Sequence, residues 1–412
     1  MIMENSKKDE QNQNNTVTEP EEAEPAVSFK SLLSCSKGYY LLVGFFSVVL
    51  LISVIFGFHG MKVGYMNVYG TSREVSWGLL ISTYIFFVVT STGLCIISSI
   101  GHVFGVKELM PIAKRAVFLS IVTILSGFAV IFFEIENPFR MAIYNVISPN
   151  LTSNIWWMGT LYGAYLVFMA AEFLFINKNN HKLASLAGLL GLISGIAAHS
   201  NLGAIFAMLH GREYWYGPYL PIYFIASAMM SGCATILFFS WLAYRINKET
   251  IGAPMHNALQ TVGKLCALMI AVIAFFTTWK LLTGLVGGEG KVETIKALLF
   301  GPYAFNFWML EMLLGLIIPF AIFFISKFRN LNLMFVASLL MVVSIYFMRY
   351  DLVIIGQVVP SFHELDVTQY KGLLEYTPTI HEILISMGGI SMTALLFLLG
   401  EKIFRGHKSE IH

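Results

Sequence analysis

Ten apolar stretches, each long enough to cross a lipid bilayer as a helix, recur along this chain of 412 residues. Inside the hydrocarbon, backbone N–H and C=O groups must bond within their own segment, so such stretches fold as helices. Only 12% of the residues are charged and 57% are hydrophobic, which excludes an ordinary soluble protein. We therefore predict an all-α polytopic membrane protein. The predicted spans are Tyr39–Phe58, Ser76–Ile100, Ala116–Glu134, Ile155–Ile176, Leu183–Leu209, Pro218–Tyr244, Val262–Leu285, Pro302–Ile325, Leu331–Tyr350 and Ile380–Leu399.

The distribution of basic residues predicts the orientation. Most of the 26 lysine and arginine residues fall in the two tails and in the connections that share a side with them. Because basic segments stay on the cytoplasmic side, both termini are expected there, in a bacterial or archaeal inner membrane. The longer connections, such as Gly288–Gly301 and Asp351–Thr379, then lie outside and are expected to be functional or to contact a partner.

Ionisable side chains gather where the third predicted span reaches the outer interface. This stretch contains Glu134, Glu136, Asn137 and Arg140. Charges at the edge of a span are either functional or anchors of the helix end. Pro138 cannot continue the helix, so we expect the chain to bend and these side chains to converge on one point.

A few ionisable groups lie deeper in the predicted spans. His199 and Glu311 are near mid-membrane, Glu172 is towards the inner end of its span, and Arg349 is near the outer end of the ninth. Burying a charged group in lipid costs free energy, so each of these side chains is expected either to pack in a hydrogen-bonded structural role or to belong to a proton or substrate pathway. For Glu311, a buried ion pair with Arg349 and a proton relay are both open.

Haem and metal ligation are not expected in this chain. Bis-histidine haem needs two imidazoles at matched depth, and among the ten histidines His199 alone is deeply placed. The four cysteines have no metal-binding spacing, and no nucleotide-binding motif is present. The basic residues are dispersed among the loops, so nucleic acid is not an expected partner.

An ordered set of short motifs is similar to those of the polysulfide reductase NrfD family of membrane subunits. The set comprises the segment 72–78, the pattern of Glu134, Pro138 and Arg140, His199-Ser200, and Trp215 with Pro218. The C-terminal third resembles the ten-helix branch that includes the membrane subunits of hydrogenase 2 and of the Dsr sulfite-reduction complex. The residues that carry this second resemblance are Phe307-Trp308, Glu311, Gly315, Pro319, Arg349, Pro378-Thr379 and Glu382.

The resemblance implies two four-helix bundles with flanking helices. The implied divisions are a polar cytoplasmic tail over 1–38, the first helix and an outer loop over 39–75, the first bundle on the quinone side over 76–210, the second bundle over 211–351, and an outer loop, last helix and cytoplasmic tail over 352–412.

The resemblance also implies a function. Such subunits bind a quinone, here expected to be menaquinone, near the outer face and exchange electrons with a ferredoxin-like iron-sulfur subunit. They hold no haem or redox metal, and further catalytic or multihaem cytochrome subunits complete a respiratory oxidoreductase that also translocates protons in some cases. The chain would then be a subunit without catalytic activity of its own.

Quinone chemistry moves protons as well as electrons, so donors and a titratable group must meet the headgroup. We expect Glu134 or Glu136 to exchange the proton, Arg140 to balance their charge, and Asn137 and His199 to contact the carbonyl oxygens. The aromatic side chains expected to flank the ring are Trp77, Tyr84 and Trp215, which could equally belong to the interfacial belt. Two alternatives are open: a proton-coupled secondary transporter that uses His199 and Glu311, and a membrane anchor with no quinone site.

Overall fold

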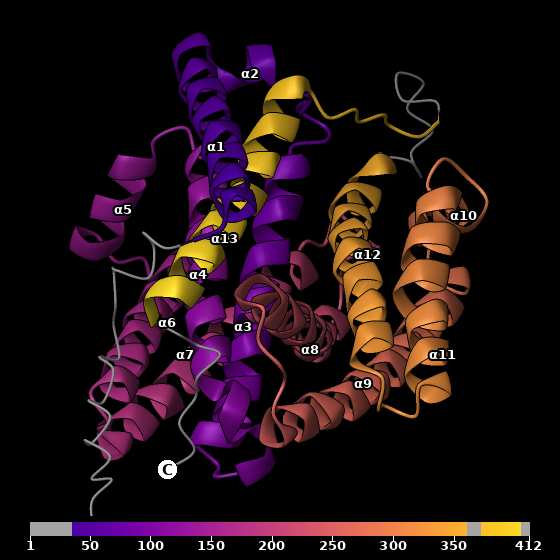
Figure 1. The fold of residues 1–412 in the computed structure, drawn as a ribbon. Coiled ribbons are helices and arrows are strands. Elements are labelled where there is room, and N and C mark those ends of the chain that lie inside the picture. Colours follow the sequence, from indigo (N-terminus) through magenta and orange to yellow (C-terminus); the bar gives the residue numbers. More distant parts are fainter. Residues whose placement is uncertain (1–34, 361–371, 405–412) are drawn as a thin grey trace, which may run out of the picture.

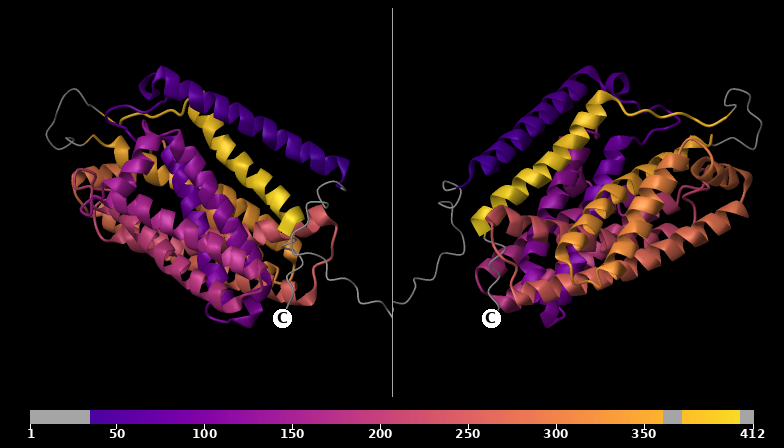
Figure 2. Two further views of the ribbon diagram at one scale, coloured as in Figure 1. Left: turned by 90° about the vertical axis from the view of Figure 1, so that its left-hand side faces the viewer. Right: turned by 45° about the vertical axis from the view of Figure 1, so that its right-hand side comes forward.

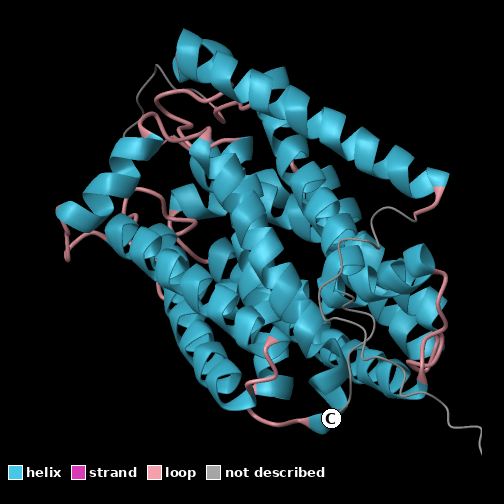
Figure 3. Ribbon diagram, turned by 60° about the vertical axis from the view of Figure 1, so that its left-hand side comes forward, coloured by secondary structure: helices cyan, strands magenta, loops and turns pink. Residues whose placement is uncertain are grey.

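The computed structural model describes residues 35–360 and 372–404, and this part of the chain folds into helices without a strand (Figure 3). Ten of the helical segments in it are long and apolar enough to cross a membrane, which confirms the predicted architecture. These spans are α1 (Lys37–Val63), α3 (Leu79–His102), α4 (Met110–Phe132), α6 (Asn154–Asn177), α7 (His181–Ala207), α8 (Tyr219–Asn247), α9 (Ala253–Leu285), η3 (Asn306–Ile317) continued by α11 (Ile318–Ile325), α12 (Leu331–Val358) and α13 (Ile380–Phe404).

The connections between the spans differ on the two sides of the membrane domain. The side on which α1 begins and α13 ends is called the chain-end side here, and the opposite side, where α4 ends, is called the Glu134 side. Three short helices lie on the Glu134 side: α2 (Tyr65–Val68), α5 (Pro138–Ile147) and α10 (Glu289–Leu299). The chain-end side has shorter turns and the single-turn helix η2 (Lys107–Leu109).

Local capping interactions set where several spans begin. The side chain of Ser153 accepts a hydrogen bond from the backbone of Trp156 at the start of α6, and Asn330 accepts from two backbone N–H groups at the start of α12. These contacts satisfy donors that have no partner within the first helical turn. Proline occupies the first turn of α4, α5 and α9, where its missing N–H costs nothing.

The centre of the molecule is the crossing of α3 and α8 (Figure 1). Gly93 of α3 lies against the backbone of Ala228 and Gly232 of α8, so a β-carbon at either glycine would overlap the other helix. Small residues allow this close approach, which is how helices associate where lipid offers no hydrophobic driving force. Helix α3 also packs against α4, α7 and α12 and therefore joins the two predicted bundles.

Helix α1 lies outside the other helices and packs along α13 (Figures 1 and 2). Near the Glu134 side, the imidazole rings of His59 and His381 stack, with Nδ1 of the first 3.0 Å from Nε2 of the second. Further along, Gly388 of α13 admits the side chain of Ser53. The exposed apolar surface of α1, which includes Leu41, Phe45 and Leu51, is consistent with a lipid-facing helix.

The predicted spans were approximate, and two differences in their bounds bear on the site. Helix α4 stops at Phe132, and a new helix, α5, begins at Pro138 where an irregular bend was expected. Helix α12 continues to Val358, so Asp351 lies inside a helix and not in the outer loop. The predicted span ended at Tyr350 because burying the carboxylate of Asp351 costs free energy. In the structure this carboxylate is buried and accepts a hydrogen bond of 3.1 Å from Asn306, which offsets part of that cost.

The segment η3 is a π-helix of 12 residues that carries Glu311 on its buried face. Pro319 follows within the first turn of α11 and has no N–H to donate towards the preceding turn, so the regular α-helical bonding cannot run through. Wide turns of this kind are rare and occur often at functional sites. Gly315 in the same segment lies against Ser344 of α12, which seats Glu311 between helices.

Candidate functional site

A cavity of about 540 Å³ lies on the Glu134 side between α3, α4, α5, α6 and α7. Its volume falls in the range of small-molecule sites, and its wall is mostly apolar, with aromatic and aliphatic side chains. The polar groups that reach it belong to Trp77, Tyr84, Glu134, Asn145 and Tyr162. A planar, apolar molecule with a few polar atoms fits such a lining.

Glu134 is the titratable group of the cavity. It follows the end of α4 in a loop that is fixed by Tyr69, whose hydroxyl donates to the carbonyl of Phe133 at 2.7 Å. Its Oε2 atom is buried and has no hydrogen-bond partner among the described residues. Burial, together with the negative charge of Glu382, raises the pKa of Glu134 from 4.5 to about 8. The carboxyl group can therefore hold or release a proton near neutral pH.

Glu382, at the start of α13, organises the chain behind Glu134. Its Oε2 accepts hydrogen bonds from the backbone N–H of Gly70 at 2.8 Å and of Thr379 at 3.0 Å. Its Oε1 accepts from the hydroxyl of Tyr376 at 2.5 Å, and that hydroxyl in turn accepts from the backbone N–H of Leu79 at 2.7 Å. These bonds fix the start of α3 relative to α13. They also satisfy the Glu382 carboxylate, whereas the Glu134 carboxylate is left with an open oxygen.

Tyr162 and His199 form a hydrogen-bonded pair that leads from the cavity wall into the protein. The Tyr162 hydroxyl is 3.1 Å from His199 Nδ1, and His199 Nε2 is 3.1 Å from the carbonyl oxygen of Phe224. A carbonyl oxygen only accepts, so Nε2 carries the hydrogen and Nδ1 of the neutral ring accepts from the tyrosine. His199 is fully buried and does not line the cavity itself; it is linked to the cavity wall through Tyr162.

Trp77 is held at the cavity by its backbone. Gln357 of α12 accepts from the Trp77 N–H at 3.0 Å and donates to its carbonyl at 2.8 Å. Arg212 donates to the carbonyl oxygens of Gln357, Val359 and Glu74, which ties the end of α12 to the start of α3. The indole of Trp215 stacks on that of Trp77, with 5.3 Å between the ring centroids, so Trp215 supports the wall from behind.

Three residues predicted for the site do not converge with Glu134. Glu136, Asn137 and Arg140 are all exposed and absent from the cavity lining. The guanidinium of Arg140 lies over the ring of Tyr144, one turn further along α5. Because Pro138 starts a new helix, the residues after Glu134 turn with α5 towards the surface.

Two cavity residues, Asn145 and Tyr162, were missed by sequence reasoning. Asn145 projects from α5, which was not predicted, and donates from its amide to the hydroxyl of Thr160 at 3.1 Å. Tyr162 is one of 18 tyrosines, and nothing in the sequence around it distinguishes it from a packing residue. The one signal was its place in an otherwise apolar span, where a hydroxyl needs a partner.

A second buried polar group lies between α8, α9, η3 and α12. It contains Glu311, Lys280, Asp351 and Arg349. All of these except Arg349 line a small cavity beside Tyr214. The predicted contact between Glu311 and Arg349 is not formed, because no ion pair of 4.0 Å or less joins them in the described chain. The three side-chain nitrogens of Arg349 have no hydrogen-bond partner there.

Arg349 instead lies over an aromatic ring. Its guanidinium carbon is 5.5 Å from the ring centroid of Phe224, the residue whose carbonyl oxygen binds His199. Lys280 is likewise placed over Tyr214, with Nζ 4.2 Å from the ring centroid. The second buried group therefore borders the Tyr162–His199 pair through Phe224. The sequence offered a signal for Lys280, since a lysine within an apolar span is unusual.

Two buried ion pairs lie towards the chain-end side. Glu172 contacts His102, with Oε1 and Nδ1 3.2 Å apart, while its Oε2 atom has no partner in the described chain. Arg115 binds Glu401 through two nitrogens, at 2.6 and 3.3 Å, and joins α4 to α13. Glu172 is thus paired with His102 and does not line the cavity, although it shares α6 with Tyr162.

Metal ligands are not clustered in the described residues, where no group of three or more histidine, cysteine, aspartate or glutamate side chains could hold an ion. What the arrangement offers chemically is an apolar slot, one open carboxyl oxygen and a tyrosine hydroxyl backed by histidine. These groups suit proton exchange with a bound organic molecule.

Comparison with known proteins places this architecture in a family. The family model described as polysulphide reductase, NrfD, matches residues 67–361. The chain belongs to the NrfD family. The match begins just before α3 and ends beyond α12, so it covers all the helices that form the cavity and the second buried group of this NrfD-family chain.

Curated relatives extend the similarity to nearly the whole chain. A selenate reductase subunit from Mesobacillus selenatarsenatis is 26% identical over 404 residues, which cover 88% of this chain and 92% of the relative. An Hdr-like menaquinol oxidoreductase integral membrane subunit of Archaeoglobus fulgidus is 25% identical over 394 residues, with 92% and 96% covered. A putative dimethyl sulfoxide reductase membrane subunit of Halobacterium salinarum is 28% identical over 384 residues, with 83% and 85% covered. All three names specify a subunit of a reductase or oxidoreductase, and two of them specify a membrane subunit.

Proposed function

We propose that this NrfD-family protein is the quinone-interacting membrane subunit of a respiratory oxidoreductase complex. In this proposal the cavity beside Glu134 receives the headgroup of menaquinone or menaquinol. The name of the Archaeoglobus relative, which specifies menaquinol, supports the choice of quinone. The subunit exchanges electrons between the quinone pool and an iron-sulfur subunit, and other subunits carry the terminal reaction.

The observation that carries this proposal is the open oxygen of Glu134 in an apolar cavity of about 540 Å³. A buried carboxyl oxygen without a partner costs free energy and therefore calls for a ligand. The aromatic walls of Trp77 and Tyr84 match a flat ring. None of the described residues that line the cavity carries a charge opposite to Glu134, so the ligand would meet a neutral, protonated carboxyl group near pH 7.

The residues of the cavity have distinct roles in the proposal. A bound quinone or quinol supplies the two-electron chemistry. Glu134 donates or accepts the accompanying proton, because its pKa of about 8 lies near the working pH. On the other wall, the Tyr162 hydroxyl donates to His199 and leaves its oxygen free to accept from a hydroxyl in the cavity.

The proposed orientation puts both termini in the cytoplasm and the Glu134 side outside. The distribution of lysine and arginine supports this arrangement. The helices α2, α5 and α10 then face the partner that carries the iron-sulfur clusters. Electron transfer between the cavity and that partner would cross the short loops around Trp77 and Arg212.

The second buried group favours an added role in proton translocation. Glu311 and Asp351 are buried and Lys280 is half-buried beside them, at a depth where ionisable groups mark proton pathways. Phe224 joins this group to His199 and hence to the proposed quinone site. We propose that the Arg349 guanidinium, across the Phe224 ring from His199, couples the charge of this group to the quinone site during turnover. A transporter without quinone chemistry would use the same group, but it would leave the cavity beside Glu134 without a role.

The test is the substitution Glu134→Gln in the intact complex, because it keeps the shape of the side chain and removes the titratable proton. Quinol-linked turnover should fall by roughly 100-fold or more, the usual effect of removing a general acid or base. The dissociation constant of a menaquinol analogue should stay nearly unchanged. Glu136→Gln is the matched control, since that carboxylate lies two residues away and is exposed.

Three results are informative. Loss of turnover in Glu134→Gln with normal activity in Glu136→Gln supports the assignment. Normal turnover in both variants would show that Glu134 only anchors the helix end and that the quinone site lies elsewhere. A complex that lacks iron-sulfur protein and does not bind the quinol analogue would favour the transporter or anchor alternative.

A further inference from the structure

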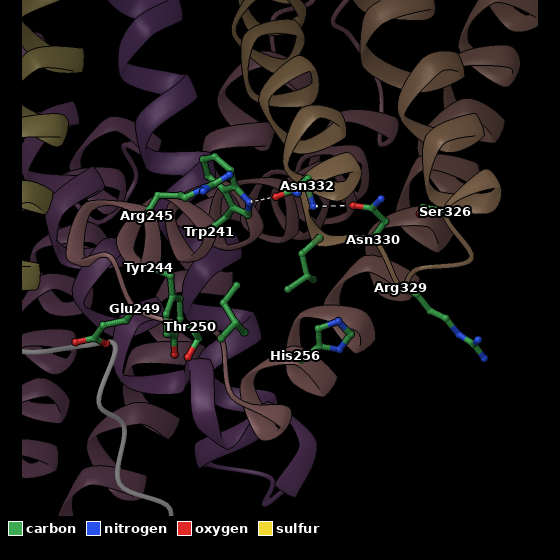
Figure 4. Close-up of a pocket in the computed structure, with 12 residues that line it drawn as sticks. Trp241, Tyr244, Arg245, Glu249, Thr250, His256, Ser326, Arg329, Asn330 and Asn332 are labelled. Atoms are coloured by element: carbon green, nitrogen blue, oxygen red, sulfur yellow. Dashed lines mark hydrogen bonds between the residues drawn. The ribbon is translucent and has the colours of Figure 1, made fainter.

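A groove of about 630 Å³ lies on the chain-end side, far along the chain from the proposed quinone site (Figure 4). It is formed where α8 ends, α9 begins, α11 ends and α12 begins. The side chains that matter here are Trp241, Arg245, His256, Arg329 and Asn332, together with Glu249 at one edge. The groove is open, and its volume suits a small polar group, not a second protein domain.

The charge of the groove is positive. Arg245 and Arg329 both contribute to its wall, and none of the three ion pairs in the described chain uses either of them. Glu249 is the acidic residue of the lining, and its carboxylate points away from the arginines and His256 (Figure 4). His256 adds a ring N–H donor. The groove is therefore lined by hydrogen-bond donors and positively charged side chains, and Glu249 is the one acidic side chain among the described residues of its lining.

The backbone adds to this potential. Helix α9 begins at Ala253 beside the groove, and its N-cap residue, Gly252, provides no side-chain acceptor. Pro254 has no N–H, but the uncapped N–H groups of Ala253 and Met255 and the helix dipole favour an anion at this end. The start of α12, in contrast, is capped by Asn330, so its first donors are already satisfied.

The groove is continuous with an aromatic and aliphatic surface on its membrane side. The ring of Trp241 stacks on Phe335 at 3.9 Å between centroids and donates from Nε1 to Asn332 at 2.9 Å. The guanidinium of Arg245 lies 4.9 Å from the Trp241 ring centroid, which fixes the cation at the top of this surface. Below it, Leu333 and Val336 of α12 are exposed.

We propose that this groove binds the headgroup of an anionic phospholipid of the leaflet on the chain-end side. The phosphodiester would lie at the start of α9, and the acyl chains would run along α12. The exposed side chains of Arg245 and Arg329, whose guanidinium groups point apart in Figure 4, would turn towards it from opposite edges of the groove. Basic pockets between membrane helices bind such headgroups, and a tryptophan at the interface matches their depth. An acidic protein segment would not need the aliphatic surface that continues the groove.

Native mass spectrometry of the full, delipidated chain in detergent tests the proposal. Phosphatidylglycerol and phosphatidylcholine with identical acyl chains are titrated separately, and inorganic phosphate is added as a competitor. One arginine near an anionic group is worth about fivefold in affinity, so Arg245→Gln with Arg329→Gln should weaken phosphatidylglycerol binding by about 25-fold. The control pair is Lys178→Gln with Lys182→Gln, two exposed lysines on the same side that do not line the groove.

Tight binding of phosphatidylglycerol that is lost in the arginine pair and retained in the lysine pair supports the site. Equal affinities for the two lipids, or equal losses in the two variant pairs, would overturn it. Displacement by millimolar phosphate would assign the groove to a free anion and not to a lipid. A photoactivatable phosphatidylglycerol provides a second measurement on the unmodified protein: cross-links should concentrate in 241–256 and 326–336, and cross-links spread evenly over the chain would contradict the proposal.

Discussion

Glu134 should make the protein less stable as the pH rises, and Glu134→Gln should remove this effect. The folded-state pKa of about 8 exceeds the ordinary value of 4.5, so the folded protein retains this proton over a pH range in which the unfolded chain has lost it. The free energy of unfolding then falls with increasing pH between these two values and levels off above about 8.

The size of the effect follows from the same two pKa values. Each pH unit changes the free energy of unfolding by about 1.4 kcal/mol, so the full interval corresponds to about 5 kcal/mol. Because the Glu134 side chain is half-buried and water screens part of its charge, we expect about 2 kcal/mol. Burial is the main cause of the raised pKa and the charge of Glu382 the smaller one.

The assay is reversible unfolding in mixed detergent and dodecyl sulfate micelles at pH 5 and pH 9. Glu134→Gln and the unmodified protein should have similar stability at pH 5, where both side chains are neutral, and the variant should be about 2 kcal/mol more stable at pH 9. Glu136→Gln should follow the unmodified protein at both pH values. The reasoning is refuted if Glu134→Gln retains the same difference between the two pH values as the unmodified protein.

Three further predictions concern the buried contacts. Glu382→Gln weakens or removes four charge-assisted hydrogen bonds, so it should lower the free energy of unfolding by up to about 4 kcal/mol. The control, Glu375→Gln at an exposed position, should change it by less than about 0.5 kcal/mol in the same denaturation assay. Arg115→Met and Glu401→Gln should each lower the free energy of unfolding by about 3 to 5 kcal/mol, and the double variant should lose clearly less than the sum of the two. Additive losses would mean that the two side chains are not coupled. Tyr162→Phe should reduce quinol-linked turnover at least tenfold with near-normal assembly of the complex, and unchanged turnover would exclude this hydroxyl from the proton route.

Several parts of this protein could be predicted from the sequence because they depend on local properties. A bilayer requires about 20 apolar residues for each helix, so Tyr39–Phe58 and the other nine spans are visible in the chain itself. The same rule marks Glu134 as an ionisable group at the end of a span. Trp77, Tyr84 and Glu134 were expected at one site, and all three line the cavity.

The tertiary structure decided which polar groups meet. Glu136 and Arg140 lie only two and six residues after Glu134, yet both are exposed at the surface, while Tyr162 of α6 lines the same cavity as Glu134. Helix rotation and packing determine these directions, and the hydropathy of a span is nearly the same for every rotation about its axis. For the same reason Glu311 and Arg349 lie within the same buried group without pairing, since the π-helix and the ring of Phe224 set their positions.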